Sequence, residues 1–466
     1  MSPRIRLYRL GRHAHGNDLE VSCGVLDIMD GNEVKWRIVT DCGSATDSGQ
    51  KKPGLDLSLF DDGRPIDLVR ITHAHFDHVG DLPRLLPYLG LNAAIVMTKP
   101  TQMTAERILR SGLHVERPRY TEDQVKETLR RIRAIMRPGE HEFLPGIKDW
   151  VQPEGHVNGA CSFTTRLGTA NVHYSGDRCD HDQPGILGAL PLPEKWRPTV
   201  IAGSDCTYGA ADDAKAVSWV SEMDRAARFA SETMSRGGRV LFFTFAVHRG
   251  GAVAAGLQQR GVARLGRIFM DGSAIDFAKL MAQHRLYWSA RDRQIDINRV
   301  TFIKDARHRF GVASSKRAYA VVAPPGMGGP AGSGVWWRER LLGDPDAAIG
   351  FTGYVAPGTD GHRILQAAAA RDRLGLKEIP LKLQTMLKDG RLGEIETVLR
   401  CKVDQFRLGS HNRRGLILDW FRLYKPEVAV LSHGSPTSFD SLEAELQGDI
   451  PQLYRADRTA ALEIDL

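Results

Sequence analysis

The feature that most constrains this chain is the run Thr72-His73-Ala74-His75-Phe76-Asp77-His78, which follows a strand-like segment at 66–71. Three histidines and one aspartate lie within its last six residues. Alternate side chains of an extended segment share a face, so His73 and His75 can reach one metal ion. Where the chain turns towards a helix expected near 81–86, Asp77 and His78 point to a second position. Imidazole and carboxylate ligands suit zinc, with manganese or iron as less favoured occupants.

Other ligand-type residues lie on both sides of this run. His156 stands in the glycine-flanked segment Gly155-His156-Val157-Asn158-Gly159, and Asp177 follows a strand expected at 172–174. The two carboxylate oxygens of Asp177 could bridge two cations. Asp41 ends another strand-like segment and is expected behind the ligands, where it would orient one of them. Each of these residues is a weak signal alone, but the ordered set predicts a pair of metal ions.

The rest of the chain shows the alternation of an α/β protein. Short apolar runs bounded by Gly, Pro, Asp or Ser predict strands at 68–71, 200–202, 240–245, 318–322, 348–351 and 428–431. A capping box formed by Thr121 and Gln124 begins a predicted helix, and the stop signal Pro138-Gly139 ends it. In that helix Val125, Leu129, Ile132 and Met136 would share one face.

Composition narrows the class of protein further. The 466 residues include 63 Lys and Arg against 56 Asp and Glu, a formal charge of +7, and their apolar content suits two to three globular domains. The longest charge-free run, 318–337, carries three prolines and five glycines, so no membrane span is expected. No signal peptide is expected either, and six cysteines without a CxxC pair favour reduced thiols and a cytoplasmic location. The modest positive charge permits an acidic partner such as nucleic acid.

Taken in order, Asp41, His73-x-His75-x-Asp77-His78, His156 and Asp177 resemble the four motifs of the metallo-β-lactamase superfamily. Later segments resemble its β-CASP subgroup of nucleases. They are Gly203–Gly209 with Asp205, the strand at 238–246, Pro325–Gly329, the stretch 350–361, Gly409-Ser410-His411 and Leu431-Ser432-His433-Gly434. The resemblance covers residues 20–435. It departs from the family at Asp205, where Glu is frequent, and at His248, where many relatives carry a small residue.

The resemblance implies a fold and a division into domains. An αββα sandwich would be formed by residues 1–208 and 395–466, and a Rossmann-like β-CASP domain would be inserted at 209–394.

It also implies a role for each site residue. His73, His75 and His156 would bind one Zn2+, Asp77, His78 and His433 would bind another, and Asp177 would bridge them, with Mn2+ as the alternative metal. The resemblance implies four catalytic residues, Asp77, Asp177, Asp205 and His411. His411, steered by Asp205, would be the general acid, and Ser410 would touch the scissile phosphate.

The activity implied is that of a zinc-dependent ribonuclease that cuts single-stranded RNA, as an endonuclease, a 5′–3′ exonuclease or both. His433 favours RNA, because the RNA-acting branches carry histidine there whereas the DNA-repair branch generally has valine. Three alternatives stay open: a DNA-end-processing nuclease of the same family, a catalytically silent scaffold subunit, and a small-molecule hydrolase, against which the β-CASP motifs argue. Assembly into a homodimer is also left open.

Overall fold

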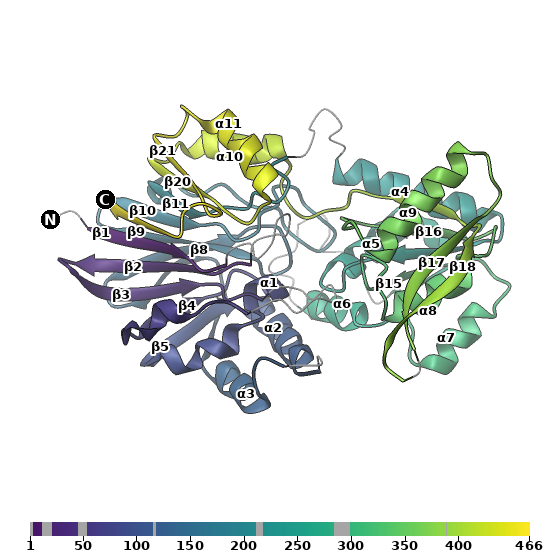
Figure 1. The fold of residues 1–466 in the computed structure, drawn as a ribbon, viewed down its shortest axis with the longest axis horizontal. Helices are drawn as coiled ribbons and strands as arrows, with labels where there is room; N and C mark the ends of the chain where they lie inside the picture. Colours follow the sequence, from purple (N-terminus) through teal and green to yellow (C-terminus); the bar gives the residue numbers. More distant parts are fainter. Residues whose placement is uncertain are drawn as a thin grey trace. The chain divides into compact units, whose positions relative to one another are not determined.

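The structure is a computed structural model, and it describes residues 3–11, 21–44, 54–114, 118–210, 218–283, 299–387 and 389–466. The chain divides into two compact units (Figure 1). Unit 1 contains Met1–Asp182, Ile186–Ala216 and Ser410–Leu466, and unit 2 contains Gln183–Gly185 and Val217–Gly409. In this division the second unit ends at 409 rather than at 394, because the strand at 402–405 pairs within its sheet. The domain assignment made from the sequence stays a prediction.

Two sheets, each of seven strands in the described residues, form the centre of unit 1. The strand order of the first is β22 (Ala461–Asp465), β1 (Arg4–Arg9), β2 (Gly24–Asp30), β3 (Glu33–Thr40), β4 (Ile66–Arg70), β5 (Leu89–Thr98) and β6 (Ile132–Ile135). The order of the second is β21 (Gln452–Arg455), β20 (Val428–Leu431), β11 (Val200–Gly203), β10 (Ala170–Tyr174), β9 (Cys161–Leu167), β8 (Ile147–Pro153) and β7 (Gly139–Leu144).

The sheets pack face to face, with helices on their outer faces. Ile28 and Leu68 of the first sheet meet Phe163 and Val172 of the second in one buried core. The outer face of the first sheet is covered by α2 (Lys99–Ser111) and α3 (Glu122–Arg130), and that of the second by α10 (Arg414–Tyr424) and α11 (Pro436–Leu446) (Figure 1). Each helix buries one apolar stripe against a sheet. The predicted αββα sandwich is confirmed.

The predicted helix that follows Thr121 is shorter than expected. Its capping box is present, with Thr121 Oγ1 accepting from the Gln124 N–H, but the helix ends at Arg130. Residues Ile132–Ile135 form β6 instead and pair in parallel with β5. The apolar spacing that continues past 130 fits a strand edge equally well, and hydrogen bonding to β5 decides the outcome. Near 81–86 the expected helix is a 3-10 helix at Leu82–Tyr88.

Unit 2 contains a parallel sheet with helices on both faces. Its order is β14 (Thr301–Phe302), β13 (Arg267–Met270), β15 (Tyr319–Ala323), β12 (Arg239–Phe243), β16 (Ala348–Phe351) and β19 (Lys402–Gln405). Helices α4 (Trp219–Ser235), α5 (Arg249–Gln259) and α6 (Ala274–Gln283) cover one face, and α7 (Ala306–Ala313), α8 (Ser333–Leu341) and α9 (Asp360–Arg373) cover the other. The hairpin β17 (Ile379–Met386) and β18 (Leu392–Leu399) also packs on this second face. This is the α/β arrangement expected for a Rossmann-like domain.

Two features expected from composition can be checked directly. All six cysteines are buried, and none forms a disulfide. Among the described residues, no helix combines the length and the apolar character needed to cross a bilayer.

A buried ion pair links the two sheets of unit 1. Arg70 Nη1 of β4 lies 2.8 Å from Asp149 Oδ1 of β8, and side-chain exposure is 2% and 0%. Asp149→Ala would leave the guanidinium buried without a carboxylate, so we expect the free energy of unfolding to fall by about 3–5 kcal/mol in urea denaturation. Glu396→Ala, which breaks the exposed pair Lys382–Glu396, is the control and should cost about 0.5 kcal/mol or less. Equal losses in both variants would contradict the structural role of this pair.

Candidate metal centre

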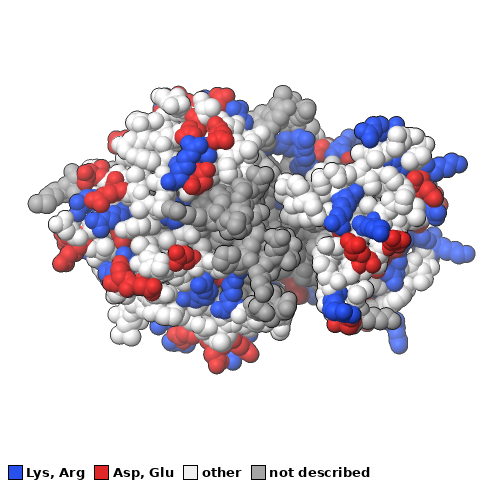
Figure 2. Space-filling view, in the orientation of Figure 1, with Lys and Arg blue, Asp and Glu red and all other residues white. Residues whose placement is uncertain are grey.

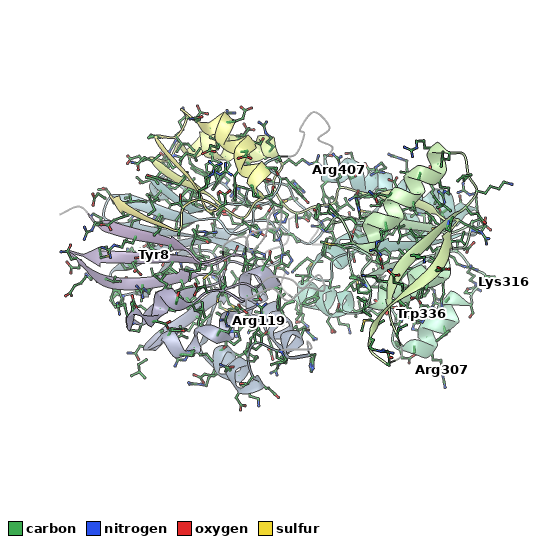
Figure 3. All side chains as sticks on the ribbon, viewed as in Figure 1. Tyr8, Arg119, Arg307, Lys316, Trp336 and Arg407 are labelled. Atoms are coloured by element: carbon green, nitrogen blue, oxygen red, sulfur yellow. The ribbon has the colours of Figure 1, made fainter. Side chains whose placement is uncertain are left out.

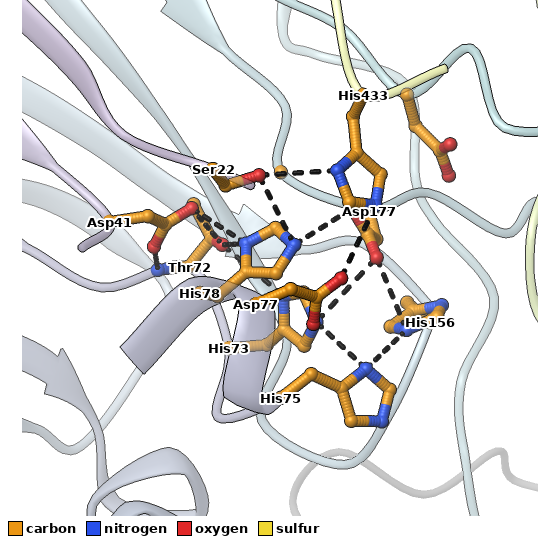
Figure 4. Close-up of polar contacts among 12 residues, drawn as sticks. Ser22, Asp41, Thr72, His73, His75, Asp77, His78, His156, Asp177 and His433 are labelled. Carbon is orange, nitrogen blue, oxygen red and sulfur yellow. Dashed lines mark hydrogen bonds and ion pairs between the residues drawn. The ribbon is translucent and has the colours of Figure 1, made fainter. Parts of the chain in front are cut away.

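The candidate site residues lie at one edge of the two sheets of unit 1. Each follows the carboxyl end of a strand: Asp41 after β3, the run 72–78 after β4, His156 after β8, Asp177 after β10, Asp205 after β11 and His433 after β20. Pairing explains why they meet, because β3 is parallel to β4, and β11 is parallel to both β10 and β20. Residues more than 350 positions apart are thereby placed in one cluster (Figure 4).

Three imidazoles of this cluster converge on one point. His75 Nδ1 lies 3.0 Å from His73 Nε2 and 3.0 Å from His156 Nε2. Asp177 Oδ2 lies 3.6 Å from His73 Nε2 and 3.4 Å from His156 Nε2. These four ligand atoms all lie within 4.8 Å of one another. Three nitrogens and one oxygen around a common centre match the donor set of a tetrahedral zinc site.

A second group lies on the other side of the Asp177 carboxylate. Asp177 Oδ1 is 3.3 Å from His78 Nε2 and 3.2 Å from His433 Nε2, and His433 Nε2 is 4.0 Å from Asp77 Oδ2. Burial works to lower the pKa of His433, but the Asp177 carboxylate raises it to about 9. Positive charge is therefore favoured at this position, and a bound cation would take the place of the proton.

Asp177 contributes one oxygen to each group. Its Oδ1 atom is buried and accepts no hydrogen bond of good geometry from the described residues, although two imidazole nitrogens lie close to it. A buried acceptor without a hydrogen bond is costly unless a cation satisfies it. Together with the converging nitrogens, this oxygen shows that the residues fit a divalent metal ion.

Burial sets the protonation of the first group. It lowers the pKa of His75 to about 4, and it lowers the pKa of His73 and of His156 well below the usual range, with neighbouring imidazoles adding to the effect. For Asp177 burial works to raise the pKa, but His433 and the other imidazoles lower it well below its usual range. Neutral imidazoles and an ionised carboxylate are the forms that bind metal.

Hydrogen bonds from behind fix two of the imidazoles. Asp41 Oδ2 lies 2.9 Å from His78 Nδ1, and the same carboxylate accepts from the Thr72 N–H and hydroxyl, each at 2.8 Å. The backbone carbonyl of Ser410 lies 2.7 Å from His156 Nδ1. Such partners orient imidazole ligands and raise their basicity. Asp41 thus contacts His78 and the Ser410 carbonyl contacts His156, while the orienting role of Asp41 stays a prediction. Contact between Ser410 and a phosphate stays a prediction.

Ser22 is a contact that the sequence did not predict: its hydroxyl lies 3.3 Å from His78 Nε2 and 3.2 Å from His433 Nδ1. No motif marks Ser22, because its place depends on pairing between segments distant in sequence. Gly43 was also overlooked: a Cβ atom there would lie 1.7 Å from the Asp77 carbonyl oxygen. Asp41 and His433 have positive φ angles of 62° and 49°. Non-glycine residues adopt this left-handed conformation rarely, so the surrounding structure has to hold both residues in it.

His411 and Asp205 form a pair beside the metal ligands. His411 Nδ1 lies 2.8 Å from Asp205 Oδ2, which also accepts from the Arg178 N–H at 2.9 Å. Burial works to lower the pKa of His411, but Asp205 raises it above its usual value. His411 Nδ1 is 4.0 Å from Asp177 Oδ2, so the pair borders the first group. This arrangement favours the protonated imidazole of His411 more than an isolated histidine would.

Comparison with known proteins agrees with this geometry. Residues 18–177 match the metallo-beta-lactamase superfamily. The chain is 27% identical over 421 residues to Transcription termination factor FttA of Methanocaldococcus jannaschii, which covers 85% of this chain and 63% of that protein. It is 25% identical to Cleavage and polyadenylation specificity factor 73 of Drosophila melanogaster, with 96% and 62% covered. An RNase J-like protein of M. jannaschii is 24% identical, with 90% and 91% covered.

The matched length of the relatives and one solved structure complete the comparison. The chain spans 63%, 67% and 62% of the length of the first three relatives that it matches. A crystal structure of a protein of unknown function from Enterococcus faecalis V583 superposes with a TM-score of 0.57 at 12% identity over all of both chains, which indicates a shared fold.

Asp41 can be tested apart from the ligands themselves. In Asp41→Asn, the single amide oxygen cannot accept both from the Thr72 N–H, which bonds to Oδ1, and from His78 Nδ1, which bonds to Oδ2, so His78 loses its fixed orientation. We expect the affinity for an added divalent cation such as zinc, measured by competition with a chromogenic chelator, to fall about 10–100-fold while the thermal unfolding midpoint stays close to wild type. Asp56→Asn, at an exposed carboxylate that accepts from the Ser58 N–H, should leave zinc affinity unchanged. Unchanged affinity in Asp41→Asn would show that Asp41 does not support a metal ligand.

Proposed function

The chain belongs to the β-CASP family of metallo-β-lactamase-fold proteins, and from that premise we propose that it is a zinc-dependent ribonuclease acting on single-stranded RNA. The observation that carries the proposal is the Asp177 carboxylate, with one oxygen 3.4 Å from His156 Nε2 and the other 3.2 Å from His433 Nε2. A single carboxylate between two donor groups suits a pair of cations that act on one phosphodiester.

In this proposal the two groups hold two zinc ions, with manganese as the alternative. The ligands are His73, His75 and His156 on one side and Asp77, His78 and His433 on the other, with Asp177 shared. When bound, such ions supply hydroxide from water near neutral pH and neutralise charge that develops on the phosphate. The carbonyl of Ser410 orients the His156 ring for this role, and the carboxylate of Asp41 orients the His78 ring.

His411 is the proposed general acid. Its Nδ1 is held by Asp205 at 2.8 Å, which leaves Nε2 to donate a proton to the departing ribose oxygen. Asp205 is the positioning residue, because its carboxylate fixes the ring and raises the His411 pKa. Products would carry a 5′-phosphate and a 3′-hydroxyl, from internal cleavage, from 5′–3′ exonucleolytic cleavage or from both.

We propose RNA rather than DNA as the substrate on two grounds. Relatives include an RNase J-like protein and a cleavage and polyadenylation specificity factor, whose names refer to RNA. His433 is also a ligand-type residue of the cluster, and the RNA-acting branches that the chain resembles carry histidine at this position. The full ligand set counts against a catalytically silent scaffold. DNA-end processing is the second candidate, and comparison of matched substrates decides between them.

The shared carboxylate gives a direct test. Asp177→Asn keeps the shape of the side chain but removes the negative charge between the two groups. We expect it to lower the rate of hydrolysis of a 5′-labelled single-stranded RNA by at least about 10³-fold, while circular dichroism shows a folded protein. Asp56→Asn is the matched surface control and should keep the wild-type rate.

Two further arms accompany this test. Chelator should abolish hydrolysis, and added zinc or manganese should restore it. A DNA strand of the same sequence should be cut more slowly than the RNA. Retained RNA hydrolysis in Asp177→Asn, or faster cleavage of DNA than of RNA, would overturn the proposed function.

The role of His411 can be separated from metal binding by the leaving group. Asp205→Asn should lower RNA hydrolysis by about 10²–10⁴-fold, because the ribose oxygen needs a proton to depart. Hydrolysis of bis(p-nitrophenyl) phosphate should fall much less, since p-nitrophenolate departs without one. Equal losses on the two substrates would show that Asp205 serves the metal ions rather than the acid.

A further inference from the structure

The positive charge of this protein is concentrated in unit 2. Residues 183–185 and 217–409 contain 30 Lys and Arg against 18 Asp and Glu, a formal charge of +12. The remainder of the chain contains 33 against 38, a formal charge of −5. The overall +7 therefore hides a basic unit 2 and a slightly acidic unit 1. On the face of unit 2 seen in Figure 2, blue side chains are widespread and red ones are fewer.

One part of unit 2 combines this charge with one exposed and one half-buried aromatic ring. We call it the α7–α8 surface and define it by Lys304, Arg307, Phe310, Lys316, Trp336 and Arg340. The four cations among these six residues are exposed, and none has an ion pair with a carboxylate among the described residues. Figure 3 shows Arg307 and Lys316 at the outer edge of unit 2. Some exposed arginines elsewhere in the described chain are paired, for example Arg130 with Glu127 and Arg400 with Glu378.

The two aromatic rings of this surface contact each other and the Arg340 guanidinium. The Arg340 guanidinium lies over the Trp336 ring, 3.5 Å from its centroid, and 5.4 Å from the Phe310 centroid. Phe310 meets Trp336 edge to face at a centroid distance of 5.1 Å. Phe310 nevertheless keeps 52% of its surface exposed. An exposed ring beside a stacked guanidinium offers two flat faces to an unpaired base.

A buried network holds α7 and α8 in this arrangement. Asp271 accepts from Arg309 Nε at 2.6 Å and Nη2 at 2.8 Å, and also from Trp337 Nε1 at 2.7 Å. Arg309 belongs to α7 and Trp337 to α8, so one carboxylate fixes both helices. Beside α7 an open hollow of about 910 Å³ has a mixed lining that includes the cations Lys279 and Arg267 and the carboxylates of Asp276 and Asp305. The rings and charges are thus presented by a fixed framework.

We propose that the α7–α8 surface binds a single strand of RNA, with Phe310 and Arg340 stacking on bases and Arg307, Lys304 and Lys316 contacting phosphates. The proposal rests on the proposed function only in taking RNA as the polymer. Unpaired cations match a polyanion, and the exposed ring distinguishes a single strand from a duplex, whose bases are already stacked. A binding surface on unit 2 would retain RNA independently of the metal ligands, all of which belong to unit 1.

Binding is measured with full-length protein in an Asp177→Asn background, so that the strand stays intact. A fluorescent 20-nucleotide oligo(U) is titrated at several salt concentrations. We expect Phe310→Ala to weaken binding about fivefold or more, as loss of one stacked base requires. We expect Arg307→Glu combined with Lys316→Glu to weaken it at least about tenfold and to lower the salt slope by about 1.4, as loss of two phosphate contacts requires.

Matched controls separate local from overall charge. Arg133→Glu combined with Arg137→Glu changes two exposed arginines of unit 1 by the same amount, and Leu91→Ala removes an apolar side chain that is 92% exposed. Both should leave affinity within about twofold. Ultraviolet crosslinking of oligo(U) to the unsubstituted surface, mapped by mass spectrometry to Phe310 or Trp336, tests the same contact without any substitution.

Several outcomes would overturn the proposal. They are equal losses in the unit 1 control, tighter binding of a duplex than of the single strand, and crosslinks confined to unit 1. Unchanged affinity in the α7–α8 variants would show that RNA does not bind this surface. Hydrolysis of bis(p-nitrophenyl) phosphate by the wild-type chain tests the proposed function separately from RNA binding. The α7–α8 substitutions, made in an otherwise wild-type chain, should leave the rate of this hydrolysis unchanged.

Discussion

The site depends on one buried carboxylate placed between two sets of imidazoles. Asp177 is stable as an anion at this depth only because positive charge surrounds it, and the closely spaced nitrogens around it are stable only if a cation or proton separates them. The buried carboxylate and the imidazoles around it therefore stabilise each other. Their mutual requirement explains why strand ends from distant parts of the chain have to meet at one edge of the sandwich.

The sandwich supplies that meeting point through strand pairing. The pairing of β20 beside β11 brings His433 next to Asp177, and the return of the chain at Ser410 brings a carbonyl to His156. Small residues permit the close approach of these loops, as Gly43 does against the Asp77 carbonyl. The strained backbone at Asp41 and His433 is held by the same hydrogen bonds that orient the ligands. The same strand pairing and packing that form the sandwich therefore also bring the site residues together.

The division of charge gives the two units different physical properties. Unit 1 is slightly acidic overall and concentrates its chemistry in a buried cluster, whereas unit 2 carries a large basic excess on its surface. A net charge of +7 for the whole chain conceals this difference. Electrostatic attraction of a polyanion depends on local rather than total charge, so the basic unit is the part of the chain suited to hold it.

The sequence by itself determined the α/β class, most strand positions and the identity of the candidate ligands. It could do so because His73, His75, Asp77 and His78 stand at fixed short spacings beside a strand, where local geometry restricts what they can do. It did not end the helix at Arg130, since the apolar spacing of 132–135 suits either element and only pairing with β5 makes it a strand. It gave no sign of Ser22, of the Ser410 carbonyl or of the α7–α8 surface. These depend on contacts between segments far apart in the chain, which pairing and packing of the folded protein decide.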